Sequence, residues 1–253
     1  MTSPCARFRG LIAVAVALVF VIGCGGEGSS QPTATARQPG TGADVPENVF
    51  QNGSFELGEG PWISLSTEAW GTPFRLTDEV AHSGRYSALL EMRGPSEASG
   101  AKVFGVVQEV SPSQFPEIIS GYYRVNSWQR GTEKQYLQFV VIVWGATNLP
   151  GGFANHQMRY PLGGISEPPF QLANARFVFL NTGEPRVGEW VYFERPIRED
   201  FRRFWNAVPE GFSSIRVLFE ARYDDKQPGS QLGADVVYDD LYVGPAATNP
   251  NAH

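Results

Sequence analysis

Few side chains in this sequence are suited to catalysis. The chain has only three histidines, at positions 82, 156 and 253. Of these, His156 is the only candidate general base, because His82 lies in a predicted framework hairpin and His253 is the last residue. No Gly-x-Ser-x-Gly, His-Glu-x-x-His or glycine-rich phosphate motif occurs. The sequence therefore predicts no catalytic residues. Paired carboxylates for glycoside hydrolysis would have to come from Glu109, Glu220 and Asp224.

Three segments alternate between apolar and polar side chains. In 119–126, 136–144 and 215–223 the odd positions are apolar, aromatic or glycine, so we expect them to face a core. The opposite face carries Tyr122, Arg124, Gln138, Trp144, Glu220 and Arg222. Aromatic rings stack on the apolar faces of sugar rings, and planar amide, guanidinium and carboxylate groups form paired hydrogen bonds with hydroxyls. These residue types indicate sugar binding; the alternative is a set of cross-strand ion pairs beneath another part of the chain.

The elements that position these residues are predicted to be β-strands. From residue 49, short apolar runs alternate with Gly, Pro, Asn and Asp, which is typical of strands and turns. Strands are predicted at 85–91, 103–110, 119–126, 136–144, 176–180, 190–196, 214–223 and 235–243, with one short helix at 199–207. No repeat of fixed period is present. The pattern predicts an all-β chain folded as an antiparallel β-sandwich.

Three segments resemble a known family. Residues 52–56 with Trp62, residues 82–88 and residues 238–243 are similar to the opening strand, the hairpin motif and the closing strand of carbohydrate-binding modules attached to xylanases and β-glucanases. The resemblance spans about residues 48–245 and implies a galactose-binding-like jelly roll. It departs at 145–188, where a long insertion replaces a usually shorter connection. We expect that insertion to cover or extend a ligand face.

The resemblance also implies two sites. If the three alternating segments share the concave sheet, as they would in this family, their six outward residues form one carbohydrate-binding face. The family further implies a structural Ca²⁺ ion, held by the Ser54 and Arg85 carbonyls and the Glu56 and Asp240 carboxylates, with Asp239 as an alternative. Calcium prefers six to eight such oxygen ligands. The alternative is that Glu56 and Asp240 are exposed acids at strand ends.

The N-terminus carries an export signal. Arg7 and Arg9 precede the apolar run 11–22, which is too short for a comfortable membrane span. Residues 21–24, Val-Ile-Gly-Cys, resemble the lipobox of bacterial lipoproteins. This implies a signal peptide at 1–23, cleavage before Cys24 and lipid on Cys24; the alternative is a plain secretory signal. Cys5 would leave with the signal, so the mature chain would form no disulfide.

The regions outside the predicted sandwich are polar. Residues 24–47 contain no aromatic side chain and are predicted to form a lipidated, flexible linker with a reach of roughly 25 Å. Residues 246–253 are expected to be a disordered tail. Gly25 after Cys24 resembles lipoproteins sorted to the outer membrane, which places the protein in the bacterial cell envelope, and in the outer membrane if the organism is Gram-negative.

These observations favour one function over two others. Because 26 acidic residues outnumber 20 basic ones and no basic cluster occurs, nucleic-acid binding is not expected. The favoured function is that of a surface-anchored, non-catalytic lipoprotein that binds a polysaccharide or envelope glycan. The alternative is a structural envelope lipoprotein whose insertion contacts a protein partner, and a glycan hydrolase or lyase is third. An exposed aromatic cleft would favour the first function, and an insertion packed over the face would favour the second.

Overall fold

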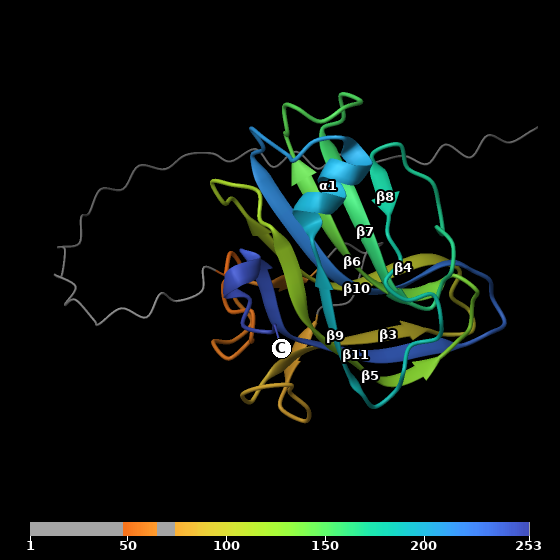
Figure 1. Ribbon diagram of the computed structural model, residues 1–253. Coiled ribbons are helices and arrows are strands. Elements are labelled where there is room, and N and C mark those ends of the chain that lie inside the picture. The colour runs from red at the N-terminus through yellow and green to blue at the C-terminus, as the bar shows by residue number, and fades with distance from the viewer. Residues whose placement is uncertain (1–47, 65–73, 253) are drawn as a thin grey trace, which may run out of the picture. The chain divides into compact units, whose positions relative to one another are not determined.

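The computed structural model describes residues 48–64 and 74–252 (Figure 1). The predicted signal peptide 1–23, the predicted lipidation site Cys24 and the linker 24–47 lie outside the described residues. Within the described ranges, no helix has the length and apolar character needed to cross a membrane.

The described chain forms two β-sheets. The six-stranded sheet has the order β1 (Ile63–Ser64), β4 (Gly100–Val110), β10 (Ser214–Lys226), β6 (Gln135–Trp144), β7 (Asn155–Gly163), β8 (Ala175–Phe177). The five-stranded sheet has the order β2 (Arg75–Thr77), β3 (Ser87–Gly94), β11 (Leu232–Gly244), β5 (Ile118–Gln129), β9 (Trp190–Arg195). Every pair is antiparallel except β7 with β8. Helix α1 (Ile197–Trp205) and the short helix η1 (Ala246–Thr248) complete the fold. The predicted all-β jelly-roll sandwich is confirmed.

The core lies between the two sheets, where alternation predicted it. The odd positions of β6, from Leu137 to Val143, are fully buried. Aromatic rings join the layers: Phe139 lies 5.0 Å from Phe193 of β9, and Phe219 lies 5.4 Å from Tyr238 of β11, centroid to centroid. Burying each such ring is worth about 1.5–3 kcal/mol. Apolar packing between the sheets therefore holds the sandwich closed.

The expectation that the three alternating segments share one sheet is wrong. β6 and β10 are neighbours in the six-stranded sheet, whereas β5 lies between β11 and β9 in the five-stranded sheet. Both sheets of a sandwich have one inward and one outward face, so alternation is the same in either sheet. The pattern therefore identified the buried positions without indicating the sheet to which each strand belongs.

The insertion and the C-terminal tail are both built into the sandwich. The insertion 145–188 contributes β7, which pairs with β6 from Asn155 opposite Trp144, and β8 beyond it. The predicted disordered tail is packed: Asn249 accepts a 2.8 Å hydrogen bond from Ser120, and Asn251 donates one of 2.7 Å to the Asp240 carbonyl. Composition missed this packing because buried amides fix the tail through hydrogen bonds and not through apolar contacts.

The first described segment is bonded to the last strand. The Leu241 N–H donates to the Gly53 carbonyl at 2.9 Å, and the Asn48 side chain donates to the Leu241 carbonyl at 2.8 Å. A Cβ atom added at Gly53 would lie 2.0 Å from that Leu241 carbonyl oxygen, which is far inside van der Waals contact. Only glycine therefore permits this close approach of the two backbones.

We predict that Gly53→Ala destabilises the sandwich. The added methyl must push the first segment away from β11, and overpacking of this kind costs about 1–3 kcal/mol. Chemical denaturation of the two variants measures the change in the free energy of unfolding. The control is Gly183→Ala, whose Cβ would have no neighbour nearer than 3.6 Å. Equal stability of both variants would show that the contact does not constrain the fold.

Candidate functional site

A network of polar side chains lies on the outer face of the six-stranded sheet. Glu220 of β10 is opposite Gln138 of β6, and the Gln138 amide donates to the Glu220 carboxylate at 2.6 Å. Arg222 donates two hydrogen bonds to Asp224, of 2.7 and 3.1 Å, and its guanidinium also lies 3.6 Å from Glu220. The two acids carry one more negative charge than Arg222 alone can neutralise.

Tyr136 and Arg159 complete the network. The Tyr136 hydroxyl donates to Asp224 at 2.8 Å, and burial raises the pKa of Tyr136 well above its usual value. Arg159 of β7 supplies a second positive charge, and burial lowers its pKa. Burial also opposes ionisation of Arg222, but Tyr136, Glu220 and Asp224 outweigh it and raise the pKa of Arg222. With both arginines charged, the network has no net charge.

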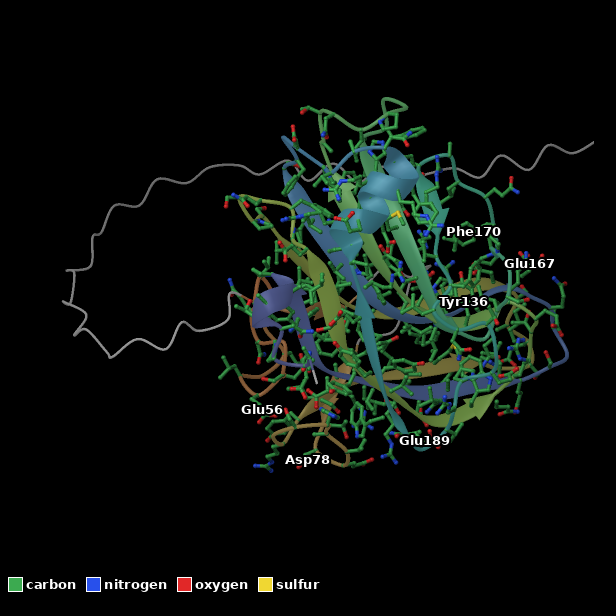
Figure 2. All side chains as sticks on the ribbon, viewed as in Figure 1. Glu56, Asp78, Tyr136, Glu167, Phe170 and Glu189 are labelled. Atoms are coloured by element: carbon green, nitrogen blue, oxygen red, sulfur yellow. The ribbon has the colours of Figure 1, made fainter. Side chains whose placement is uncertain are left out.

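Phe170 covers this network. Its ring centroid is 5.1 Å from the guanidinium carbon of Arg159 and 5.3 Å from that of Arg222. Figure 2 shows Phe170 and Glu167 on the segment that follows β7, on the same side of the sandwich as Tyr136. The polar side chains are consequently almost inaccessible: Gln138 is 0% exposed and Glu220 is 3% exposed. The insertion thus covers this face, which is one of the two arrangements expected for it from the sequence.

Two buried polar atoms of the network have no hydrogen-bond partner within the described residues. They are the Gln138 side-chain oxygen, which is an acceptor, and the Arg159 Nη1, which is a donor. An unpaired buried polar group costs about 1–3 kcal/mol. Such groups in a folded protein usually have a partner, in the protein, in water or in a ligand. The network therefore retains one unused acceptor and one unused donor.

Three of the six residues predicted to bind sugar meet here, and three do not. Gln138, Glu220 and Arg222 belong to the network, whereas Trp144 lies at the far end of β6 beside Arg216. Tyr122 and Arg124 are on β5 and hence on the other sheet. Tyr122 stacks on His82 with centroids 3.5 Å apart, and Arg124 donates to Asn126 at 3.0 Å. The six residues therefore do not form one surface.

Sequence reasoning missed two members of the site. Arg159 lies on β7, and Phe170 lies in the irregular segment that follows β7, both inside the insertion. Alternation could have identified Arg159, because it stands between two apolar or aromatic residues, Met158 and Tyr160. Both of these residues are fully buried in the structure. No comparable signal exists for Phe170, because an irregular segment has no periodicity.

The side chains considered for catalysis are constrained. His156 is 1% exposed, and its Nε2 lies 2.8 Å from the Pro150 carbonyl oxygen. Glu109 lies apart from the network: although burial raises the pKa of its carboxyl, hydrogen bonds from Ser214 and Arg216 hold that pKa below the usual value. Glu220 and Asp224 both contact Arg222. Each of these groups is therefore bonded to, or paired with, a neighbouring residue.

Two of the residues predicted to hold calcium, Glu56 and Asp240, contact the loop 82–86, which contains Arg85; no contact of Ser54 with this loop is found within the described residues. One Glu56 carboxylate oxygen accepts the Tyr86 N–H at 2.7 Å and the Arg85 N–H at 2.8 Å, and these bonds lower the pKa of Glu56. The Asp240 carboxylate accepts the Ser83 hydroxyl at 2.6 Å, and its other oxygen lies 2.7 Å from His82 Nδ1. The loop is thereby bonded to both the first segment and the last strand.

Asp239 lies behind this loop. It is fully buried and accepts the N–H groups of His82 and Ser83 at 2.7 and 3.3 Å. Burial, together with the neighbouring Asp240 charge, raises the pKa of Asp239 to about 7. Within the described residues, no group of three or more His, Cys, Asp or Glu side chains is arranged to hold a metal. A calcium ion here would therefore depend on backbone carbonyls for part of its coordination.

Comparison with known proteins finds similar folds only. No protein-family model matches the chain, and no curated protein matches its sequence. Among solved structures, TmCBM61 in complex with β-1,4-galactotriose is 17% identical, with a TM-score of 0.39 over 78% of this chain and 97% of that chain. The CBM22-1 xylan-binding domain from Paenibacillus barcinonensis Xyn10C is 16% identical, with a TM-score of 0.37 over 81% of this chain and 99% of that one.

An enzyme is also among the similar structures. The β-1,2-glucanase from Parabacteroides distasonis is 16% identical, with a TM-score of 0.35 over 74% of this chain, which spans 22% of that enzyme. The resemblance to carbohydrate-binding modules predicted from the sequence is thus found among solved structures, at a level that describes architecture and no more.

Proposed function

We propose that this protein binds carbohydrate, without cleaving it, through the outer face of its six-stranded sheet. The observation that carries the proposal is the pair of buried, unpartnered atoms beneath Phe170, the Gln138 oxygen and the Arg159 Nη1. One is an acceptor and the other a donor. A sugar hydroxyl can donate to the first and accept from the second, because a hydroxyl does both at once.

The surrounding groups suit the same ligand. The carboxylate of Glu220 and the guanidinium of Arg222 are planar groups that form paired hydrogen bonds with neighbouring hydroxyls. Since the charges of the network cancel, the face favours a ligand without a strong charge of its own.

The ligand would reach this face by displacing the cover segment, residues 165–172. The segment is held mainly by packing: within the described residues, its only hydrogen bond is from the Ala175 N–H to the Leu172 carbonyl at 3.1 Å. Ser166, Glu167 and Pro168 are exposed, whereas Ile165 and Pro169 are buried. Few hydrogen bonds therefore oppose opening. A closed cover lowers the apparent affinity in proportion to the fraction of open molecules.

A second candidate function is supported by the same cover. The insertion packs over the polar face, which favours a structural envelope lipoprotein that presents the insertion to a protein partner. In that case the network beneath Phe170 would serve only to fix the insertion, and no saccharide would bind there.

We predict that Phe170→Ala raises the affinity for polysaccharide several-fold, because it removes the ring that holds the cover closed. Isothermal titration calorimetry against xylans, glucans and galactans measures the change. The control is Leu172→Ala in the same segment, whose side chain is 44% exposed. Adding Arg159→Met to Phe170→Ala should abolish the gain.

Two other outcomes would favour a different function. If a folded Phe170→Ala variant binds nothing in the panel, the structural function is favoured. Release of reducing sugar from any bound polysaccharide would show instead that the protein is a hydrolase or lyase.

We also propose that the protein is anchored in the bacterial cell envelope through lipid on Cys24. The apolar run followed by Val-Ile-Gly-Cys supports this proposal. Two or three acyl chains hold a protein on a membrane durably, whereas one does so only marginally. We predict that Cys24→Ser abolishes metabolic labelling with a fatty acid and leaves the export run uncleaved. Labelling that persists in the variant would rule out Cys24 as the lipidation site.

A structural Ca²⁺ ion at the loop 82–86 remains part of the proposal. Support comes from the convergence of Glu56 and Asp240 on that loop from the first segment and the last strand. Bound there, the ion would supply positive charge between the two acids and stabilise the joined termini without taking part in chemistry.

We predict that calcium raises the melting temperature of the wild-type chain and that Glu56→Gln removes this increase. Differential scanning calorimetry in calcium and in EDTA measures the two states. Glu59→Gln, an exposed acid in the same turn region, is the matched control and should respond to calcium like the wild type. A melting temperature of the wild type that EDTA leaves unchanged would show that hydrogen bonds alone close the loop.

A further inference from the structure

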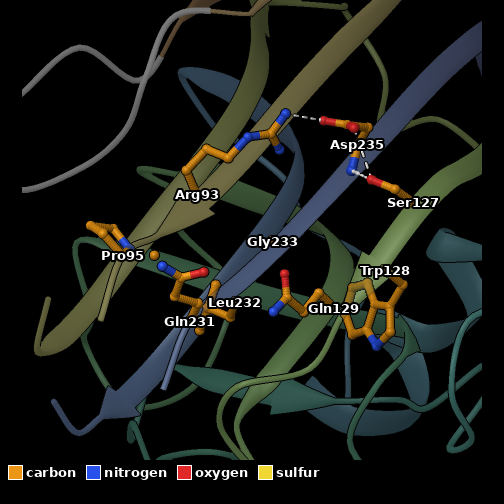
Figure 3. Close-up of a pocket in the computed structure, with 10 residues that line it drawn as sticks. Arg93, Pro95, Ser127, Trp128, Gln129, Gln231, Leu232, Gly233 and Asp235 are labelled. Carbon is orange, nitrogen blue, oxygen red and sulfur yellow. Dashed lines mark hydrogen bonds and ion pairs between the residues drawn. The ribbon is translucent and has the colours of Figure 1, made fainter. Parts of the chain in front are cut away.

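We propose that a groove on the outer face of the five-stranded sheet is a second binding site, for a neutral saccharide. The groove has a volume of about 480 Å³, within the range typical of ligand sites (Figure 3). Its polar and aromatic walls come from β3, β5, β11 and the residue before β11: Arg93, Ser127, Trp128, Gln129, Asp235 and Gln231. The proposal does not depend on the site beneath Phe170, which lies on the other sheet.

The groove exists because its floor is a glycine. Gly233 of β11 is paired with Arg93 of β3 on one side and with Gln129 of β5 on the other. Directly opposed side chains on neighbouring strands stand about 4.5–5.5 Å apart at their Cβ atoms. A residue without a side chain between two long ones therefore leaves a trough along β11. Figure 3 shows Gly233 between Arg93 and Gln129.

A β-bulge in β5 builds the far wall. Ser127 pairs with Asp235, but the next pair is Val125 with Val236, so Asn126 has no partner across the strand. The extra residue reverses the alternation beyond it. Arg124 faces outward before the bulge, and Ser127 and Gln129 face outward after it, beside Asp235 and Gly233. Without the bulge, Trp128 would take the outward position, and the polar wall would be lost.

The polar side chains of the groove are preorganised by hydrogen bonds among themselves. Arg93 donates to the Asp235 carboxylate at 2.6 Å and to the Ala234 carbonyl at 3.1 Å, and Ser127 donates to Asp235 at 2.8 Å. These bonds hold a guanidinium and a carboxylate in place. The amides of Gln129 and Gln231 make no side-chain hydrogen bond to any residue that the structure describes, so they are available to a ligand.

The charge balance and the pairing of the strands define the ligand. Arg93 is paired with Asp235 and also lies 3.5 Å from Glu91, so an anionic ligand would meet two carboxylates near the one guanidinium. An extended peptide would seek a free strand edge, but β11 is hydrogen-bonded to β3 on one side and to β5 on the other. A neutral ligand with many hydroxyls fits the amides, the ion pair and the indole edge together.

The test fills the groove without straining the fold. A Cβ at Gly233 would have no neighbour nearer than the Met92 carbonyl oxygen at 3.4 Å, which is ordinary contact. Gly233→Val should therefore fold and block the floor. The matched control is Gly183→Val, whose Cβ would lie 3.6 Å from Asn181. Full-length chain in detergent is titrated calorimetrically with cellohexaose, xylohexaose and galactohexaose as neutral probes and with trigalacturonate as the anionic one.

The expected result is that Gly233→Val weakens binding of a neutral probe at least about tenfold, or 1.4 kcal/mol, while Gly183→Val does not. The same probe should change the tryptophan fluorescence of the wild type but not that of a Trp128→Phe variant. Binding that Arg159→Met abolishes and Gly233→Val leaves intact would overturn the groove and support the Phe170 site. Binding that Gly233→Val abolishes and Arg159→Met leaves intact would support the groove and not the Phe170 site. Binding of trigalacturonate only, or of no neutral probe, would also overturn it.

Discussion

Neutralisation of one buried guanidinium constrains the covered part of the outer face of the six-stranded sheet. Arg222 is 4% exposed and can remain charged only because Asp224 and Glu220 lie against it. Removing one partner of such a pair typically costs 3–5 kcal/mol, since the other charge is then left uncompensated. Glu220 in turn fixes Gln138, and Asp224 fixes Tyr136. The positions of four side chains thus follow from the need to accommodate a single charge.

The position of the insertion depends on the charge of the same guanidinium group. Phe170 has no strand to hold it, and its ring lies against the guanidinium groups of Arg159 and Arg222. Cation–π contacts contribute about 0.5–2 kcal/mol each, which suffices to position a short segment without making its closure permanent. A cover held in this way differs from a packed core element, because none of the residues 165–172 belongs to the apolar core between the sheets. This difference is why a covered face remains compatible with binding.

The sequence predicted the fold better than the site, and particular residues show why. Alternation in β6 identified Leu137, Phe139 and Val143 as core because burial on one face is a local property of a strand. Sheet membership is not local: β5 pairs with β11, which follows it by more than a hundred residues, so Tyr122 and Arg124 could not be separated from Gln138 by pattern alone. The bulge at Asn126 was equally hidden, because an extra residue in a strand has no compositional mark.

The two outer faces that we propose as binding sites expose their polar groups in opposite ways. On the six-stranded sheet, large side chains fill the face, and its polar groups are protected by an aromatic cover. On the five-stranded sheet, the absence of one side chain at Gly233 leaves polar groups open to solvent. The apparent affinity of a closed face is reduced, because it scales with the fraction of molecules in which that face is open. An open face has no such reduction, but it offers a ligand fewer surrounding contacts. If both bind, one domain holds two saccharide segments on opposite sides, and avidity for a polymer would exceed the affinity of either face.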